Sequence, residues 1–208
     1  MRELPILYST PMVQAILENK KKMTRRIAGL EKVNEHPDNW KIVVGDWTTS
    51  GILFFNRNGY SDRMKPRYQV GDKIYVKETY RITNPYGNPN YKYKADFDSN
   101  ITGVKFKWKP SLFMPKAAAR IWLEVTNVRC ERLHDITEAD AIAEGIFSKI
   151  DEIYKYPIYR IYYKMENNWW SSNPIESFQS LWEMINGDDC WILNPWVFVY
   201  EFKRIEKP

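Results

Sequence analysis

Residues 19–26, NKKKMTRR, place five cations and one hydroxyl within eight positions. The segment before them predicts a short helix over 11–19, because the turn at 9–11 puts hydroxyl residues ahead of a proline at the first helical position. Lysines at the carboxyl end of a helix interact favourably with its dipole, but one or two suffice for that purpose. The cations here continue past the helix through Thr24 to Arg26, and this excess predicts an anionic partner.

Glu78 is a second candidate for chemistry, in a turn and strand predicted over 70–80. Ile74 and Val76 share one face of this strand, and strict alternation puts Glu78 on the same, inward face. A carboxylate that points into a core needs a partner, and a lysine is the obvious candidate. The alternative is an exposed glutamate on an edge strand that pairs with a nearby arginine.

The composition limits the class of protein. A chain of 208 residues with 44% apolar residues suits one domain with sizeable insertions. Its formal charge of +5 is compatible with a nucleotide or nucleic-acid ligand, and its aromatic residues can either pack in a core or stack on bases. The two cysteines and two histidines show no zinc-type spacing and no disulfide framework, so we expect no metal and no cofactor. Because no signal-peptide pattern and no apolar run of membrane-spanning length is found, we expect a cytoplasmic protein without a membrane partner.

Strands outnumber helices in the predicted order of elements. The strands do not alternate regularly with helices, as they would in a parallel sheet. The sequence predicts strands at 4–8, 41–44, 52–55, within 70–80, and at 91–95, 104–108, 120–128 and 197–202, and helices at 11–19, from Thr137 to Gly145 and from Asn173 to Gly187. We therefore expect an α+β fold, a small mixed β-barrel that is closed by the final strand and decorated with helices and loops. A single domain is predicted over residues 1–208, with insertions near 30–65 and 148–172.

Two motifs resemble a known family. Asn19-x-Lys21-x-x-Thr24-x-Arg26 resembles the GxKxxTxR signature of the ASCH domain, with Asn19 where that family has glycine. Residues 71–78, GDKIYVKE, resemble a strand of the same family that begins with Gly-Asp and ends with Glu. The wider pattern, from residue 4 to 205, is similar to that of prophage-encoded ASCH proteins. Its other matching segments are 9–12, 24–26, 108–111, 114–115, 118–120 and 194–197.

This resemblance implies a PUA-like β-barrel and a ligand among RNA and modified nucleosides. Small relatives are amidohydrolases that deacetylate N4-acetylcytidine, and their catalytic set falls here on Lys21, Thr24 and Glu78. The implied roles are Thr24 as nucleophile, Lys21 as the base that accepts its proton, and Glu78 as the proton donor to the leaving amine. A hydroxyl becomes a good nucleophile only when an adjacent base takes its proton, and a lysine can be that base if burial and neighbouring cations lower its pKa. Arg26 can hold a developing oxyanion or a substrate phosphate.

The alternative interpretation is a non-catalytic RNA- or DNA-binding module of phage origin. In that case cations contact phosphates while Trp108 or Tyr80 stacks on a base. The predicted phosphate ligands are Lys20, Lys22, Arg25, Arg26, Lys109 and Lys116. A third interpretation, a phage-encoded protein that binds a host partner, has only the aromatic content in its favour. The predicted partner is therefore a nucleoside, a nucleotide or a nucleic acid, with RNA favoured over DNA.

Overall fold

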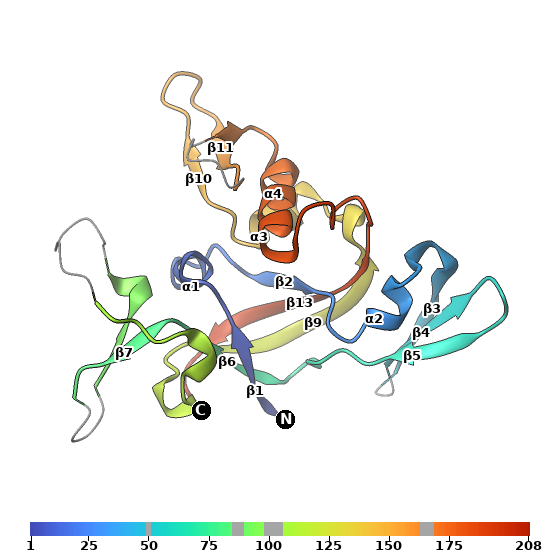
Figure 1. Ribbon diagram of the computed structural model, residues 1–208, viewed down its shortest axis with the longest axis horizontal. Coiled ribbons are helices and arrows are strands. Elements are labelled where there is room, and N and C mark those ends of the chain that lie inside the picture. The colour runs from blue at the N-terminus through green and yellow to red at the C-terminus, as the bar shows by residue number, and fades with distance from the viewer. Residues whose placement is uncertain (49–50, 85–89, 98–105, 163–168) are drawn as a thin grey trace.

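The centre of the computed structural model is a sheet built around two long antiparallel strands, β9 (Trp122–Arg132) and β13 (Trp196–Ile205) (Figure 1). Three shorter strands, β1 (Glu3–Leu7), β6 (Lys73–Lys77) and β2 (Met23–Arg26), complete the order β1-β6-β9-β13-β2. β1 pairs with β6 in parallel, and the other neighbouring pairs are antiparallel. The structure describes residues 1–48, 51–84, 90–97, 106–162 and 169–208.

The alternation of apolar residues decides which face of these strands is buried. Ile121, Leu123 and Val125 at the start of β9 are fully buried, whereas Thr126 is exposed. In β6 the side chains of Ile74 and Val76 are likewise fully buried. The inward face that the sequence predicted for both strands is confirmed.

The α+β class is confirmed, but the described strands do not close into the predicted barrel. β13, the expected closing strand, lies inside the sheet between β9 and β2, and β1 and β2 form its two edges. The chain passes from one edge to the other through helix α1 (Thr10–Leu17), which buries Met12, Val13 and Ile16 in the core. Side-chain packing of this helix, instead of strand pairing, therefore connects the two edges.

Three smaller antiparallel sheets extend from the central sheet (Figure 1). They are formed by β3 (Trp40–Thr48), β4 (Gly51–Asn56) and β5 (Ser61–Met64); by β7 (Tyr80–Ile82) and β8 (Tyr91–Tyr93); and by β10 (Ser148–Ile150), β11 (Pro157–Arg160) and β12 (Trp170–Ser171). The first and the last coincide with the segments near 30–65 and 148–172 that the sequence marks as insertions.

Two predicted strands differ from the structure. The strand expected at 91–95 is shorter, because the chain turns into a single 3-10 turn, Lys94–Asp96, after β8. Of the strand expected at 104–108, residues 106–108 do not form a strand, and residues 104–105 lie outside the described residues. The next residue, Lys109, makes only an isolated bridge to Tyr80.

Two of the remaining helices begin at the caps that the sequence predicts. Thr137 Oγ1 accepts a hydrogen bond from the backbone N–H of Asp140 at 3.1 Å, and Asn173 Oδ1 accepts one from Ile175 at 2.8 Å. The helices are α2 (Glu31–Asn34), α3 (Glu138–Ala143) and α4 (Pro174–Asn186), and the other 3-10 turns are Pro37–Asn39, Ser111–Phe113, Lys116–Ala118 and Leu133–Asp135. None of the helices in the described part of the chain is long and apolar enough to cross a membrane.

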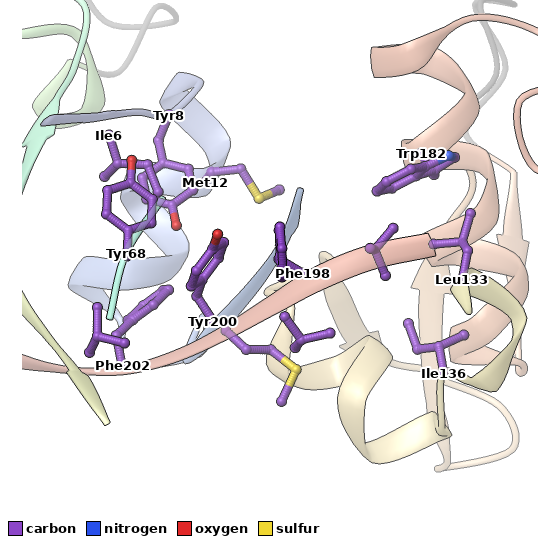
Figure 2. Packing of buried hydrophobic residues seen from close by; sticks show 14 of the residues in the cluster. Ile6, Tyr8, Met12, Tyr68, Leu133, Ile136, Trp182, Phe198, Tyr200 and Phe202 are labelled. Carbon is purple, nitrogen blue, oxygen red and sulfur yellow. The ribbon is translucent and has the colours of Figure 1, made fainter. Parts of the chain in front are cut away.

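One hydrophobic core runs along β13 and joins the sheet to α1 and α4. Figure 2 shows Tyr8, Tyr68 and Tyr200 grouped at one end of this core and Trp182, which projects from α4, near the other end. The rings of Tyr68 and Tyr200 meet edge to face, with centroids 5.0 Å apart. This packing holds α4 and the end of β1 around β2, which carries the signature residues Thr24 and Arg26.

Candidate active site

The turn after α1 leads directly into the site. Asn19 has a φ of 58°, the left-handed conformation that ends many helices and that glycine and asparagine adopt most easily. The backbone N–H groups of Lys20 and Lys21 donate to the carbonyl oxygen of Ala15 at 2.8 and 3.0 Å. At the glycine position of the ASCH-like signature, Asn19 therefore has a backbone conformation that favours glycine.

Gly145 allows the end of α3 to approach this turn. It has a φ of 82°, and a Cβ at this position would lie 2.6 Å from the Cβ of Lys21 and 3.0 Å from that of Ala15. The backbone N–H of Lys22 donates to the carbonyl oxygen of Ala143 at 2.8 Å across the same contact. Glycine is required here because any side chain would push the two segments apart. The approach brings Glu144 beside Lys21.

A cavity of about 360 Å³ opens at this place, a size suited to a small organic ligand. The end of β1, strand β2, Glu144 and helix α4 form its walls. Its lining residues are Leu7, Tyr8, Ser9, Met12, Lys21, Thr24, Arg25, Arg26, Ile27, Ala28, Glu144, Phe178, Leu181, Trp182, Met184, Ile185 and Asn186. The cavity thus has a polar side from β2 and a mainly apolar side from α4.

Lys21 is buried and held by Glu144. Its Nζ donates to Oε2 of Glu144 at 2.9 Å and to the backbone carbonyl oxygen of Glu144 at 2.7 Å. The pKa of Lys21 is lowered from its ordinary value, chiefly because burial disfavours the charged form. Arg26 and Arg25 lower this pKa further, whereas the Glu144 carboxylate raises it. Lys21 is therefore easier to deprotonate than a lysine on the surface.

Arg25 is fully buried and ties Glu144 to two further carboxylates. Its Nη1 donates to Oε1 of Glu144 at 3.2 Å. Its Nη2 donates to Oε1 of Glu131 at 2.7 Å and to Oδ2 of Asp140 at 2.8 Å. The structure places Arg25 in this ion cluster and not on a surface that phosphates can reach.

Four buried polar atoms of residues that line the cavity make no close hydrogen bond in the described part of the chain, although two of them, the hydroxyls of Tyr8 and Thr24, lie within reach of each other. They are Tyr8 Oη, Thr24 Oγ1, Arg25 Nε and Trp182 Nε1. Only one further atom of this kind, Arg81 Nε, is found among the described residues. Buried polar groups in folded proteins are nearly always paired, and leaving one unpaired costs about 1–3 kcal/mol. The concentration of such atoms around one cavity indicates a polar ligand.

Arg26 is half-buried at the edge of the cavity. Its Nη1 donates to the carbonyl oxygen of Arg25 at 3.0 Å, and its guanidinium carbon lies 5.5 Å from the centre of the Tyr8 ring. Burial raises the pKa of Tyr8, so that this phenol stays neutral and can both donate and accept hydrogen bonds. No described carboxylate pairs with Arg26, and its guanidinium is available to an anion.

Glu78 is not among the residues that line this cavity. Its predicted inward direction is confirmed, since it is 1% exposed, but its partner is an arginine and not the expected lysine. Nε and Nη2 of Arg120 donate to Oε1 and Oε2 of Glu78 at 2.9 and 3.0 Å. Burial raises the pKa of Glu78, and Arg120 opposes that rise. The planar guanidinium of Arg120 thus binds both oxygens of Glu78, and no hydrogen bond or ion pair joins Glu78 to Lys21 in the described part of the chain.

The predicted surface cations are distributed around the chain and partly paired. Lys20 Nζ lies 2.6 Å from a carboxylate oxygen of Glu18, and Lys116 pairs with Glu3. Lys22 is exposed. These lysines do not line the cavity beside β2.

The predicted stacking residues lie on the β7–β8 side of the molecule. Tyr80 is 3% exposed and its hydroxyl donates to the carbonyl oxygen of Phe113 at 2.9 Å, so its ring cannot stack on a base. Trp108 packs edge to face on Phe97, with ring centroids 5.6 Å apart. Lys109 is exposed beside it. The structure therefore separates this group from Lys21 and Thr24.

Sequence analysis missed two members of the site, Glu144 and Tyr8. Glu144 precedes the glycine that ends a predicted helix, so its place at a helix end could be found from the sequence. Its contact with Lys21, which is 123 positions away, could not. Trp182 is 6% exposed, packs in the core and also lines the cavity.

Comparisons of this chain with protein-family models, with curated proteins and with solved structures find no match. Within the described ranges, no three His, Cys, Asp or Glu side chains are grouped so that they could hold a metal ion. The chemistry of the site is therefore interpreted from its own side chains.

Proposed function

We propose that this protein hydrolyses an amide bond on a modified base or nucleoside, the reaction of the ASCH amidohydrolases that its signature resembles. The observation that carries the proposal is the buried Thr24 hydroxyl, which makes no close hydrogen bond, lies within reach of the Tyr8 hydroxyl and belongs to the lining of the cavity that Lys21 also lines. A threonine hydroxyl needs an adjacent base to become a nucleophile. Lys21, a buried amine whose pKa is lowered, is suited to that role.

In the first step Thr24 Oγ1 attacks the carbonyl carbon of the acyl group, and Lys21 Nζ accepts the hydroxyl proton. The tetrahedral intermediate carries an oxyanion, for which Arg26 supplies a positive charge at the cavity edge. The intermediate then expels the exocyclic amine of the base, which takes the proton from the Lys21 ammonium and leaves an acyl-threonine ester. Water, deprotonated by neutral Lys21, hydrolyses this ester to the carboxylic acid and restores the Thr24 hydroxyl.

We assign the carboxylate of this site to Glu144 instead of Glu78. Glu144 contacts Lys21 Nζ directly and stabilises its protonated form after the first proton transfer. The Glu78 carboxylate is occupied by Arg120 on both oxygens. In this proposal the Lys21 ammonium takes the proton-donor role that the resemblance gives to Glu78, and Glu144 supports Lys21 in it.

The assignment to an ASCH or PUA-like fold is part of the same proposal. It is supported by the left-handed backbone of Asn19 at the signature glycine, and by the burial of Lys21 and Thr24 around one cavity. The motif at 71–78 coincides with β6, as the resemblance implies. The five-stranded sheet is compatible with this class, although the described strands do not close it into a barrel.

The test is hydrolysis of N4-acetylcytidine by the wild type, Thr24→Val and Thr24→Ser. We expect Thr24→Val to lose at least about a thousandfold in turnover, as removal of a nucleophile does, while Thr24→Ser keeps part of the activity. Urea unfolding should show a stability within about 1 kcal/mol for wild type and Thr24→Val, because the hydroxyl makes no close hydrogen bond beyond its contact with Tyr8 and valine has the same shape.

Two results would overturn the proposal. A folded wild type without turnover removes the amidohydrolase assignment, and RNA and DNA binding then becomes the function to measure. Turnover by Thr24→Val at the wild-type rate removes Thr24 as the nucleophile.

A further inference from the structure

A second cavity lies directly beside the first. It has a volume of about 390 Å³ and shares Leu7, Arg26 and Ala28 with the cavity of Thr24. Its lining residues are Pro5, Ile6, Leu7, Arg26, Ala28, Arg67, Tyr68, Lys77, Leu112 and Tyr200. The shared residues make the two cavities neighbouring parts of one larger site.

Three cations from separate segments converge on this second cavity: Arg26 from β2, Arg67 from the segment between β5 and β6, and Lys77 from the end of β6. No carboxylate lines it, and within the described ranges none of the three forms an ion pair. This contrasts with Arg25, whose guanidinium is neutralised by three carboxylates. Like charges that share a cavity repel one another, and a bound anion removes that repulsion.

The segment that carries Arg67 is fixed by hydrogen bonds. The backbone N–H of Arg67 donates to the hydroxyl of Tyr200 at 3.0 Å, and the hydroxyl of Tyr68 donates to the carbonyl oxygen of Pro5 at 2.7 Å. The guanidinium carbon of Arg67 lies 5.7 Å from the centre of the Tyr68 ring. Lys77 Nζ donates to the carbonyl oxygen of Leu112 and retains two further N–H donors. The cations are therefore held around the cavity without being neutralised.

We propose that this second cavity binds a phosphate group of the substrate while its base occupies the cavity of Thr24. Arginine and lysine are the usual ligands of phosphate, and Arg26 at the junction joins the two parts of the ligand. This inference rests on the proposed function for the identity of the base. It names the substrate as a nucleotide, either free or within a chain, in preference to a free nucleoside.

The test is calorimetric titration of the wild type with cytidine and with cytidine 5′-monophosphate, which are not consumed. We expect the monophosphate to bind at least about tenfold more tightly, the size of one or two charge-assisted hydrogen bonds. Arg67→Gln/Lys77→Gln should bind both ligands equally. The matched control is Arg57→Gln/Lys92→Gln, which removes the same charge at two exposed residues outside the cavity and should keep the preference.

A cytidine trinucleotide separates the two sources of phosphate. Tighter binding of the trinucleotide than of the monophosphate indicates a nucleotide within a chain, and equal binding indicates a free nucleotide. Circular dichroism of each variant verifies folding, and Arg67→Gln alone replaces the double variant if the latter does not fold.

The outcomes distinguish this inference from the proposed function. Turnover of N4-acetylcytidine combined with equal affinity for cytidine and its monophosphate overturns the phosphate site alone. A preference for the monophosphate that depends on Arg67 and Lys77, without turnover, supports the phosphate site and overturns the amidohydrolase. Absence of binding by both cytidine and its monophosphate overturns the inference.

Discussion

Two buried glutamates of this protein have different partners and therefore different chemistry. Glu144 and Glu78 are 4% and 1% exposed. Glu144 pairs with Lys21 and Arg25 beside a cavity, whereas Glu78 is bound on both oxygens by Arg120. A lysine can release its proton when burial lowers its pKa, but an arginine remains charged. The Glu144–Lys21 pair therefore includes a group that can titrate, whereas both partners of the Glu78–Arg120 pair stay in one ion pair.

The surroundings of the two ion pairs differ in the same way. Among the described residues, four buried polar atoms that make no close hydrogen bond belong to residues lining the cavity beside Glu144. Arg120, in contrast, has a second carboxylate partner, Asp96, at 2.7 Å, and stacks on Tyr93 with its guanidinium carbon 4.0 Å from the ring centre. A buried carboxylate is thus a weak indicator of a catalytic site unless its partner can titrate and a ligand can reach it.

The largest expected effect concerns the cluster that holds Glu144. Arg25→Met should lower the free energy of unfolding by about 3–5 kcal/mol, because Glu131, Asp140 and Glu144 lose their shared partner. Urea unfolding measures this loss of free energy, with Arg26→Met as the control. Arg26 is the neighbour of Arg25 on β2 and has no ion pair with a described residue, so its replacement should cost under about 1 kcal/mol. Equal costs for the two variants would show that the cluster does not hold the site.

The second prediction compares the two glutamates in turnover of N4-acetylcytidine. Glu144→Gln should lower kcat by about a hundredfold, because the protonated Lys21 loses its charged partner. Glu78→Gln should leave kcat within about threefold of the wild type, since Glu78 does not line the cavity. Initial rates at saturating substrate distinguish the two. The opposite order of effects would return the catalytic role to Glu78.

The third prediction is a pH dependence. Below the lowered pKa of Lys21 the rate should fall about tenfold per pH unit, since the charged amine cannot act as base. Glu144→Gln should move the midpoint to lower pH, because the Glu144 carboxylate raises this pKa. Glu78→Gln should leave the midpoint in place. A profile of kcat/KM against pH for the three proteins tests this, and a midpoint unmoved by Glu144→Gln contradicts it.

The lowered pKa of Lys21 also makes the stability of the protein depend on pH. Between the lowered pKa of folded Lys21 and its ordinary value of 10.5, the unfolded chain binds the proton that the folded chain does not. The free energy of unfolding contributed by Lys21 therefore increases with pH in this window and is reduced below it. Urea unfolding at several pH values should show that the free energy of unfolding of the wild type, relative to that of Lys21→Met, increases with pH in this window. A constant difference would mean that Lys21 keeps its ordinary pKa.

The smallest effect is expected at the other glutamate. Arg120→Lys should cost about 1 kcal/mol of unfolding free energy, because lysine cannot bind both oxygens of Glu78 in the planar geometry of arginine. Turnover should be unchanged. Urea unfolding and initial rates check the two parts, and a loss of turnover without a loss of stability would place Arg120 in the site.

Local pattern was sufficient to predict several parts of the fold. The inward direction of Ile74, Val76 and Glu78 follows from alternation along a strand, and the starts of α3 and α4 follow from Thr137 and Asn173, whose side chains cap them. These features depend on neighbours within a few residues.

Strand β2 shows where local pattern failed. The sequence predicts no strand at 23–26 and gives Arg25 as a phosphate ligand, yet the segment forms an edge strand in which Met23, Thr24 and Arg25 are buried. Arg25 can be buried only because carboxylates 106, 115 and 119 positions away neutralise it. No local pattern contains that information.

The sequence by itself determined the α+β class, the caps of α3 and α4 and the signature that singles out Lys21, Thr24 and Arg26, because each depends on residue type and short spacing. Only the tertiary structure decided that Glu144 is the partner of Lys21, that Glu78 is bound by Arg120, and that the described sheet stays open. The physical reason is that the pairing of buried charges depends on which side chains meet across the core, and those contacts join residues far apart in the chain.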